Sequence, residues 1–306
     1  MEKISKIKNV KDLNYKLKVA FEEAKKSKDF SDMVDSINLP DEELMKYTTS
    51  IEDSVAEYKN CKNCKGLPMC KNSMNGYCYM PVLTDGELEF SYVACKYKNK
   101  LDSETKYLNN VTSIDVPKEI KEARIKDIYT DEKSREKVIK WILNYIKDYK
   151  KGNIGKGLFL HGNFGCGKTY LVAALFNELA KDNVKSVIVY WPEYLRSLKS
   201  SFGMSNDEFK NKYNELKYAK LLLIDDLGAE GVTSWSRDEV LGTILQYRMQ
   251  EELPTFITSN LNLKELEDHL SVTTSKSLEK VKAKRIIERI KQLTIDTEML
   301  GENKRK

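Results

Sequence analysis

The chain has 306 residues, 41% of them hydrophobic and 32% charged, which is the composition of a globular protein of about two domains rather than of a disordered or fibrous one. No apolar run approaches the roughly 20 residues that cross a bilayer, and the charged N-terminus lacks the apolar core of a signal peptide, so we expect a cytoplasmic protein. The net charge of +5 is modest and unevenly distributed, because residues 276–306 contain ten Lys and Arg against five Asp and Glu. On charge alone, we interpret this basic segment as a solvated helix.

The first part of the chain, to about residue 58, is predicted to be helical. Apolar residues such as Leu13, Leu17 and Phe21 recur there at spacings of three and four. A cysteine-rich block follows, and a polar stretch beyond it indicates a linker. The predicted division is into an N-terminal domain, a linker and a second domain, at residues 1–100, 101–116 and 117–306.

Four cysteines of the block fall within eighteen residues, at the spacing of a metal site. A cytoplasmic chain keeps its thiols reduced, so metal binding is favoured over disulfides, and four thiolates suit a closed, structural zinc site. Free buried thiols are the alternative, and Cys95 competes for the place of the fourth ligand. Cys166, His161 and His269 lie elsewhere in the chain, and we assign both histidines structural roles. The expected zinc ligands are Cys61, Cys64, Cys70 and Cys78.

In the second domain, strand-like and helical segments alternate, which predicts an α/β fold with a parallel sheet flanked by helices. A long helix from about Asp131 to Tyr149 has one apolar face. The strands that we expect after it are residues 157–161, 186–190, 221–226 and 255–260.

The segment after the first of these strands fits G-x-x-x-x-G-K-[ST], the pattern of a P-loop. A helix follows it, so unpaired backbone N–H groups and the positive helix end face phosphate oxygens. Lys168 is expected to place its charge on the β- and γ-phosphates of ATP, and Thr169 to ligate Mg²⁺. The expected nucleotide-binding residues are Gly162, Asn163, Phe164, Gly165, Cys166, Gly167, Lys168 and Thr169.

Acidic and polar residues end the two later strands, at the sheet edge where α/β folds bind ligands. Asp225 is expected to hold Mg²⁺, and Asp226 stands where a base orients the attacking water, with Glu230 as a second candidate. Asn260 is either a polar group that senses the γ-phosphate or attacking water, or a turn residue before the next helix.

A P-loop, an acidic strand, a polar strand end and late arginines follow one another in an order that resembles the AAA+ ATPases. The segments 228–230, 235–241 and 246–248 are similar in particular to the loaders of replicative DNA helicases, and this resemblance extends over nearly the whole chain. It implies an AAA+ P-loop domain with a reduced lid, preceded by a small helical zinc-binding domain, and it implies ATP hydrolysis.

The resemblance also implies roles for single residues. Arg289 matches the arginine finger that is offered to a neighbouring subunit, Arg285 is the second choice, and Arg305 resembles a second nucleotide sensor. The zinc module of these loaders has three cysteines and a histidine, and Cys78 takes the place of that histidine here.

The partners that the resemblance implies are a hexameric replicative helicase, single-stranded DNA, other primosome or initiator proteins, and further copies of the chain. Arg196, Lys199 and Phe202 combine charge with an aromatic ring, as single-strand sites do, although packing of Leu195 and Leu198 in an amphipathic helix explains the same segment. Two other functions stay open: a transposon-associated regulatory AAA+ ATPase, and a nucleotide-gated adaptor without useful turnover.

Overall fold

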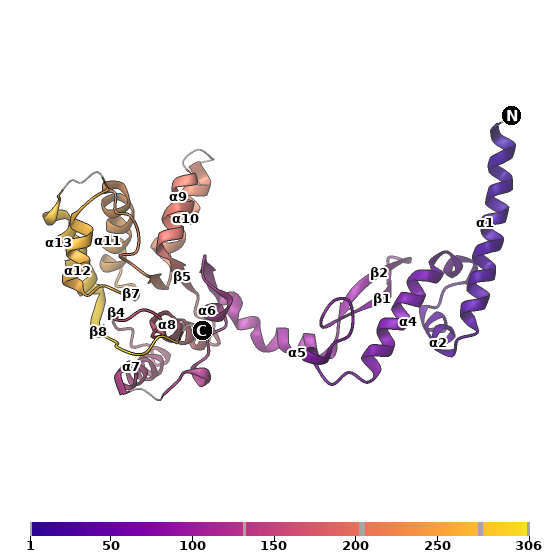
Figure 1. Ribbon diagram of the computed structural model, residues 1–306, viewed down its shortest axis with the longest axis horizontal. Coiled ribbons are helices and arrows are strands. Elements are labelled where there is room, and N and C mark those ends of the chain that lie inside the picture. Colours follow the sequence, from indigo (N-terminus) through magenta and orange to yellow (C-terminus); the bar gives the residue numbers. More distant parts are fainter. Residues whose placement is uncertain (1, 131–132, 202–205, 275–277, 305–306) are drawn as a thin grey trace. The chain divides into compact units, whose positions relative to one another are not determined.

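A computed structural model of the chain consists of two compact units, Met1–Lys106 and Tyr107–Lys306 (Figure 1). The structure describes residues 2–130, 133–201, 206–274 and 278–304. Each unit has a hydrophobic core of its own, so each is treated separately below.

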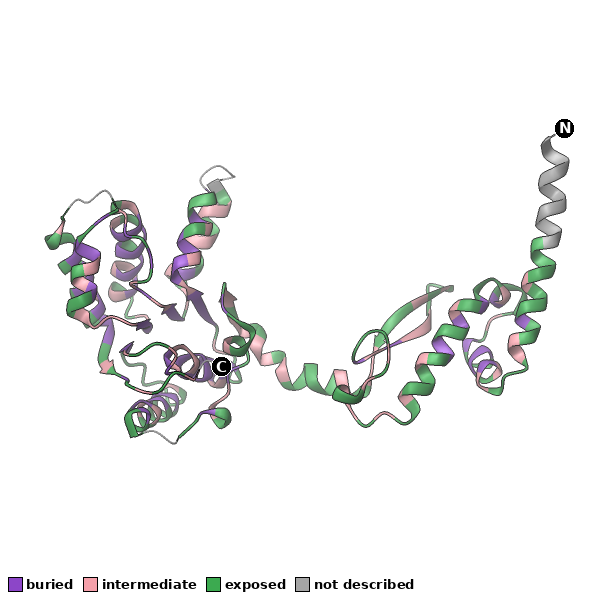
Figure 2. Cartoon of the chain, in the orientation of Figure 1, coloured by how far each residue is buried: buried purple, intermediate pink, exposed green. Residues whose placement is uncertain are grey.

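The N-terminal unit is built mainly from helices, as the sequence predicts. Eight buried apolar side chains form its core, among them Phe21, Phe30 and Ile51. Leu13 is 57% exposed, so only part of the predicted apolar stripe of the first helix is buried, and Figure 2 shows the coloured part of that helix largely exposed. The helices are α1 (Glu2–Lys25), α2 (Lys28–Ile37), α3 (Asp41–Leu44), α4 (Thr48–Lys62) and α5 (Lys96–Thr105).

The cysteine-rich block contains a β-hairpin that the sequence reasoning did not foresee. Strands β1 (Tyr77–Thr84) and β2 (Glu87–Ala94) pair antiparallel. Asp85 and Gly86 connect them with φ of 52° and 87°, the left-handed pair of a two-residue hairpin turn. An Asp-Gly pair between alternating strands is the signal that would have predicted this hairpin.

The C-terminal unit contains one six-stranded, fully parallel sheet. All four predicted strands are confirmed to within one residue, and two more strands complete the edges. The strands are β3 (Val111–Ile114), β4 (Gly157–His161), β5 (Ser186–Tyr190), β6 (Leu221–Asp225), β7 (Thr255–Ser259) and β8 (Thr294–Glu298), in the spatial order β3-β5-β6-β7-β4-β8.

Helices cover both faces of this sheet, and alternation along the strands divides the core in two. Leu158 and Leu160 of β4 face one cluster, and Phe159 between them faces the other. The helices are α6 (Lys118–Lys121), α7 (Lys133–Lys150), α8 (Lys168–Ala180), α9 (Trp191–Ser200), α10 (Asn206–Tyr218), a π-helical turn (Trp235–Leu241), α11 (Gly242–Gln250), α12 (Leu263–Ser271) and α13 (Lys280–Leu293).

The segment predicted as a linker, residues 101–116, is structured. Helix α5 runs to Thr105, and β3 pairs with β5 at the edge of the sheet. The polar composition that suggested a linker reflects exposed positions of α5 instead. The two compact units therefore meet in sequence at Lys106 and Tyr107.

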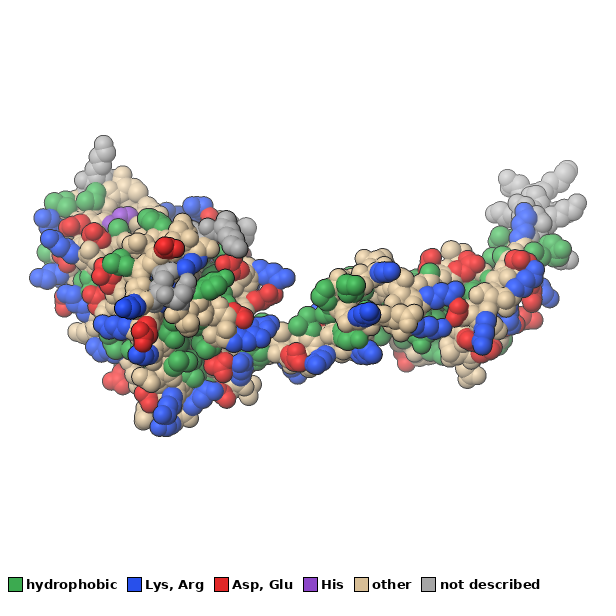
Figure 3. All heavy atoms as spheres, turned by 60° about the horizontal axis from the view of Figure 1, so that its bottom comes forward, with side chains coloured by type: hydrophobic (Ala, Val, Ile, Leu, Met, Phe, Trp, Pro, Cys, Tyr) green, Lys and Arg blue, Asp and Glu red, His purple; other side chains and the backbone are tan. Residues whose placement is uncertain are grey.

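The surface of the C-terminal unit has no single-sign face in the view of Figure 3, where basic and acidic side chains are interspersed. In the part of the chain that the structure describes, every helix is too short or too polar to span a bilayer.

Candidate active site

The P-loop, residues 162–169, connects the end of β4 to the start of α8, as the sequence predicts. Gly167 precedes the helix with φ 93°, a left-handed conformation that glycine adopts without strain. The backbone N–H groups of the first turn of α8 have no partner within the helix, and the helix dipole adds positive charge there. This end of α8 is therefore suited to an anion.

Lys168 folds back over its own loop and is only 7% exposed. Its Nζ donates to the carbonyl oxygens of Gly162, at 2.8 Å, and Asn163, at 2.7 Å. It also donates to Oδ1 of Asn260, at 2.8 Å. The ammonium charge is thus held at the mouth of the loop by oxygen atoms that a phosphate group can replace.

Thr169 and Asp225, which the sequence predicts as Mg²⁺ ligands, lie in direct contact. The Thr169 hydroxyl donates to Oδ1 of Asp225 at 2.5 Å, and Thr258 donates to the same oxygen at 2.6 Å. Burial raises the pKa of Asp225, and the two hydroxyl donors oppose that rise. A hydroxyl and a carboxylate oxygen this close are the donor types that Mg²⁺ prefers, so the residues fit the ion.

Asp226 and Asn260 are joined across the sheet edge. Asp226 has φ 59°, and its backbone N–H donates to the Thr258 hydroxyl at 3.0 Å. The side-chain amide of Asn260 donates to Oδ1 of Asp226 at 2.7 Å. A left-handed aspartate is costly away from a turn, and two bonds from the β7 end hold it here. Thr258 belongs to the strand end that the sequence indicates as the polar sensor, although Asn260 was the residue singled out there.

The strand order explains why Asn260 reaches both groups. Strand β7 lies between β4, which leads into the P-loop, and β6, which ends in the aspartates. The residue after β7 is therefore placed between Lys168 and Asp226 and contacts both. The helix that follows is capped by the side chain of Asn262, two residues further on.

Glu230 does not join this group. Its carboxylate accepts the backbone N–H of Gly228 at 2.8 Å, and His269 contacts its carbonyl oxygen at 3.1 Å. Burial raises the pKa of Glu230. His161 lies 3.2 Å from a carboxylate oxygen of Asp296, so both histidines make contacts of a structural kind.

A segment near the C-terminal end of the described chain lies against the P-loop. A Cβ on Gly162 would lie 2.0 Å from the carbonyl oxygen of Met299, and the N–H of Lys304 donates to the carbonyl of Gly165 at 2.9 Å. Cys166 is buried, and its thiol points to the carbonyls of Asn163 and Met299.

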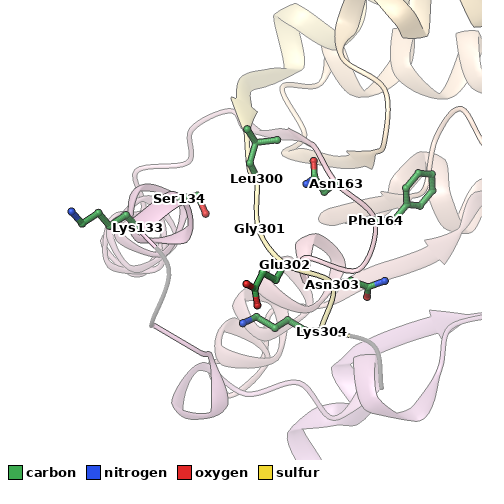
Figure 4. A pocket seen from close by; sticks show the side chains of 9 residues that line it. All are labelled: Lys133, Ser134, Asn163, Phe164, Leu300, Gly301, Glu302, Asn303 and Lys304. Carbon is green, nitrogen blue, oxygen red and sulfur yellow. The ribbon is translucent and has the colours of Figure 1, made fainter.

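Beside the loop is an open cleft of about 790 Å³. Figure 4 shows the C-terminal segment passing between the start of α7 and the P-loop there. The lining residues are Lys133, Ser134, Asn163, Phe164, Leu300, Gly301, Glu302, Asn303 and Lys304. Arg305, expected from the sequence as a second sensor, lies outside the described residues.

The chain is similar to several known proteins of bacterial DNA replication. The bacterial DnaA ATPase domain family matches residues 133–279. The replicative helicase loader DnaI of Bacillus subtilis is 36% identical over 262 residues, which cover 86% of this chain and 84% of that protein. The chain belongs to the DnaI family. A crystal structure of DnaI is similar with a TM-score of 0.56 and 44% identity, covering 65% of this chain and all of that one. The replicative helicase loader DnaC of Escherichia coli is 27% identical over 40% of this chain and 49% of its own length.

The arginines that the DnaI resemblance marked lie on α13. Arg289 is half-buried, and its Nη1 donates to the carbonyl of Gly242 in α11 at 2.9 Å. Burial lowers the pKa of Arg289, and the nearby Arg285 lowers it further. Arg285 is exposed.

The four cysteines of this DnaI-family chain are not gathered into one site. Burial and the neighbouring Cys61 thiol raise the pKa of the Cys78 thiol to about 12, so these two sulfurs lie together. Cys70 accepts the N–H of Gly76 at 3.4 Å, and Cys64 points to the carbonyl of Gly66. Among the described residues, no three Cys, His, Asp or Glu side chains are arranged to hold a metal ion.

The residues expected to touch DNA are on or just after α9. Leu195 and Leu198 are buried in the core, which confirms the amphipathic packing of this helix. Arg196 and Lys199 are exposed on its other side, and Arg196 pairs with Glu193. Phe202 lies outside the described residues.

Proposed function

We propose that this chain is an ATP-dependent loader that places a replicative DNA helicase on single-stranded DNA when replication starts or restarts. The observation that carries the proposal is the extent of its similarity to DnaI. A match of 262 residues is longer than the whole C-terminal unit, so it includes part of the N-terminal unit as well. A regulatory ATPase that shared only the ATPase domain with DnaI would not be expected to match it in the N-terminal unit as well.

Within this function, the site at the sheet edge is proposed to hydrolyse ATP. Lys168 exchanges its carbonyl partners for β- and γ-phosphate oxygens, because a phosphate offers full negative charge where a carbonyl offers a dipole. Thr169 and Asp225 would hold Mg²⁺, which neutralises charge on the phosphates when bound.

Asn260 and Asp226 are proposed to position the attacking water. Their mutual hydrogen bond fixes both side chains before any nucleotide arrives, so little reorganisation remains for the reaction. Asp226 offers a carboxylate oxygen as the base, and Asn260 keeps its contact to Lys168 as a link to the γ-phosphate.

Arg289 is proposed to complete the site of a neighbouring copy. To do so it must give up its bond to the carbonyl of Gly242, whereas exposed Arg285 on the same helix is already available. Mixing Arg289→Ala with Lys168→Ala tests action between subunits, because each mutant supplies the part that the other lacks. Partial recovery of ATPase activity in the mixture supports the assignment, and the same experiment with Arg285→Ala decides between the two.

The N-terminal unit is proposed to contact the helicase and to contain zinc. The nearby sulfurs of Cys61 and Cys78, and the N–H of Gly76 directed at Cys70, support a thiolate site. The remaining thiols do not converge in this structure, so we expect the loop between them to close when the ion binds. The pairing of Cys61 with Cys78 favours Cys78 over Cys95 as the fourth ligand.

A reconstituted loading assay tests the whole proposal. The chain, its host's replicative helicase and a circular single strand are mixed, and strand unwinding is measured with ATP, with ADP and without nucleotide. We expect unwinding to require the chain and ATP, and residues 1–106 alone to bind the helicase. Helicase binding without any nucleotide dependence or turnover would favour the adaptor instead, and no helicase binding at all would contradict loading. A separate ATPase assay compares activity with and without single-stranded DNA. If Arg196→Ala and Lys199→Ala lose the stimulation of ATPase activity by DNA, this supports contact of both residues with the single strand.

A further inference from the structure

Three arginines of the C-terminal unit are almost completely buried, and one of them differs from the others. Arg237 pairs with Asp238 and Glu279. Arg248 donates to backbone carbonyls and to a threonine hydroxyl. Arg135, in the first turn of α7, is 2% exposed, and its Nε and Nη1 have no hydrogen-bond partner among the described residues.

The surroundings of Arg135 make its lack of hydrogen-bond partners more costly. A Cβ built on Gly167 would lie 3.2 Å from Nη2 of Arg135, so the guanidinium lies against the residue that precedes α8. The N-terminus of a helix carries partial positive charge, so a cation there is repelled. Leaving buried donors of a charged group without hydrogen-bond partners adds a further cost. A buried, unpaired cation at a positive helix end is stable only if an anion joins it.

We propose that Arg135 is a further nucleotide-binding residue, which donates to an oxygen of the phosphate chain at the start of α8. The inference rests on the proposed function, because it assumes that the P-loop binds a nucleotide. Lys133 and Ser134, directly before Arg135, line the cleft that also contains Asn163 and Phe164 of the P-loop. The start of α7 and the phosphate-binding loop therefore border the same space, as Figure 4 shows.

Arginine suits this place better than lysine. Its planar fork presents two parallel N–H groups to one phosphate, and it stays charged when buried. The lack of a side chain on Gly167 leaves room for the guanidinium, since a Cβ there would crowd Nη2. The same contact couples the position of α7 to occupancy of the P-loop.

Variants of the full chain test the inference through binding and stability rather than turnover. Arg135→Gln removes the charge, Arg135→Lys keeps it without the fork, and Lys137→Gln removes an exposed charge from the same helix as a control. Affinity is measured by calorimetry for Mg·ATP, Mg·GTP and inorganic tripolyphosphate. Thermal unfolding is recorded without any of these ligands.

We expect Arg135→Gln to weaken all three ligands by about 10- to 100-fold, the range of a charged hydrogen bond. Arg135→Lys should fall between it and the parent, and Lys137→Gln should bind as the parent does. Without ligand, Arg135→Gln should unfold at the same or a higher temperature, because a repelled and unpaired charge has been removed. A purely structural arginine would give the opposite shift in stability.

Three results would overturn the inference. They are unchanged affinity in Arg135→Gln, a loss confined to ATP, which would place the contact on the base, and a lower unfolding temperature without ligand. Lys168→Ala distinguishes a failure of this inference from a failure of the proposed function. If it loses binding while Arg135→Gln does not, only this inference fails, and if the parent chain binds none of the three ligands, the proposed function fails with it.

Discussion

The residues around the P-loop of the C-terminal unit and those of the cysteine loop of the N-terminal unit, here residues 61–78, were both predicted to bind ligands, but the structure organises them differently. Around the P-loop, Lys168, Asn260 and Asp226 are already bonded to one another. In the cysteine loop, Cys61 and Cys78 lie together, but no third ligand joins them among the described residues. The first group is formed by the fold alone, whereas the second is a zinc site only by proposal.

The difference follows from what supports each loop. The P-loop extends from β4, an interior strand of a six-stranded sheet with a hydrophobic core on each face. Among the side chains of the N-terminal unit whose burial the structure describes, eight apolar residues form the core cluster, which is small for a unit of 106 residues. Small cores of this kind are often completed by a metal, whose binding energy becomes folding energy. A ligand-dependent loop is thus expected in the unit with less core.

The largest effect should come from removing zinc. We expect Cys61→Ser to lose the metal, and the N-terminal unit to lose protection from hydrogen exchange, because structural zinc is worth on the order of 10 kcal/mol in small domains. Nucleotide affinity of the C-terminal unit should not change. Metal content is measured by mass spectrometry, with Cys95→Ser as the control that keeps zinc. A parent chain purified without any zinc, yet fully protected, would contradict the comparison.

The next effect should be that of Lys168→Ala on ATP binding. We expect affinity to fall by at least about 100-fold, since a buried charge on the phosphates is lost. The fold should persist, because the sheet and its cores do not depend on this side chain. Calorimetry with Mg·ATP measures the loss, and Lys181→Ala, at the other end of α8, is the matched control. Equal losses in both variants would show that the loop is not preorganised around Lys168.

Asn260→Ala should slow hydrolysis more than it weakens binding. Removing one positioned donor typically costs about 10²-fold in turnover, and the contact to Asp226 is of that type. Steady-state ATPase assays separate kcat from KM. Asn262→Ala is the control, because it removes the cap of α12 and should lower stability by about 1 kcal/mol without affecting turnover. A turn role for Asn260 would reverse these two outcomes.

The smallest effect concerns Glu230 and depends on pH. Burial raises its pKa in the folded chain, so the folded state holds this proton more tightly than the unfolded state does. Stability is therefore lost as pH rises from the unfolded value through the folded one. Glu230→Gln should unfold at a higher temperature than the parent at neutral pH and show no gain below the unfolded pKa. Exposed Glu239→Gln is the control, and a large loss of ATPase activity in Glu230→Gln would restore Glu230 as the base.

Sequence reasoning predicted the four interior strands because each is a short, mostly apolar run. Three of them also lead directly into the P-loop, the aspartate pair or Asn260. It missed β8, whose residues Thr294–Glu298 are mostly polar, and β3, a four-residue edge strand in a polar stretch. Neither segment contains enough apolar residues to show a period. Helix α5 was not foreseen for the same reason, since it has no buried face, although the boundary between the two units does fall within the predicted linker.

The sequence by itself determined the P-loop and the family, because both depend on residue types at fixed spacing along the chain. Thr169 and Asp225 were predicted to bind Mg²⁺, but they meet only in the folded chain. Only the tertiary structure decided that Asn260 links Lys168 to Asp226, since that depends on β7 lying between β4 and β6. It also brought Arg135 to Gly167 across 32 positions of the chain. Contacts of this kind arise from strand order and helix packing, which no local pattern encodes.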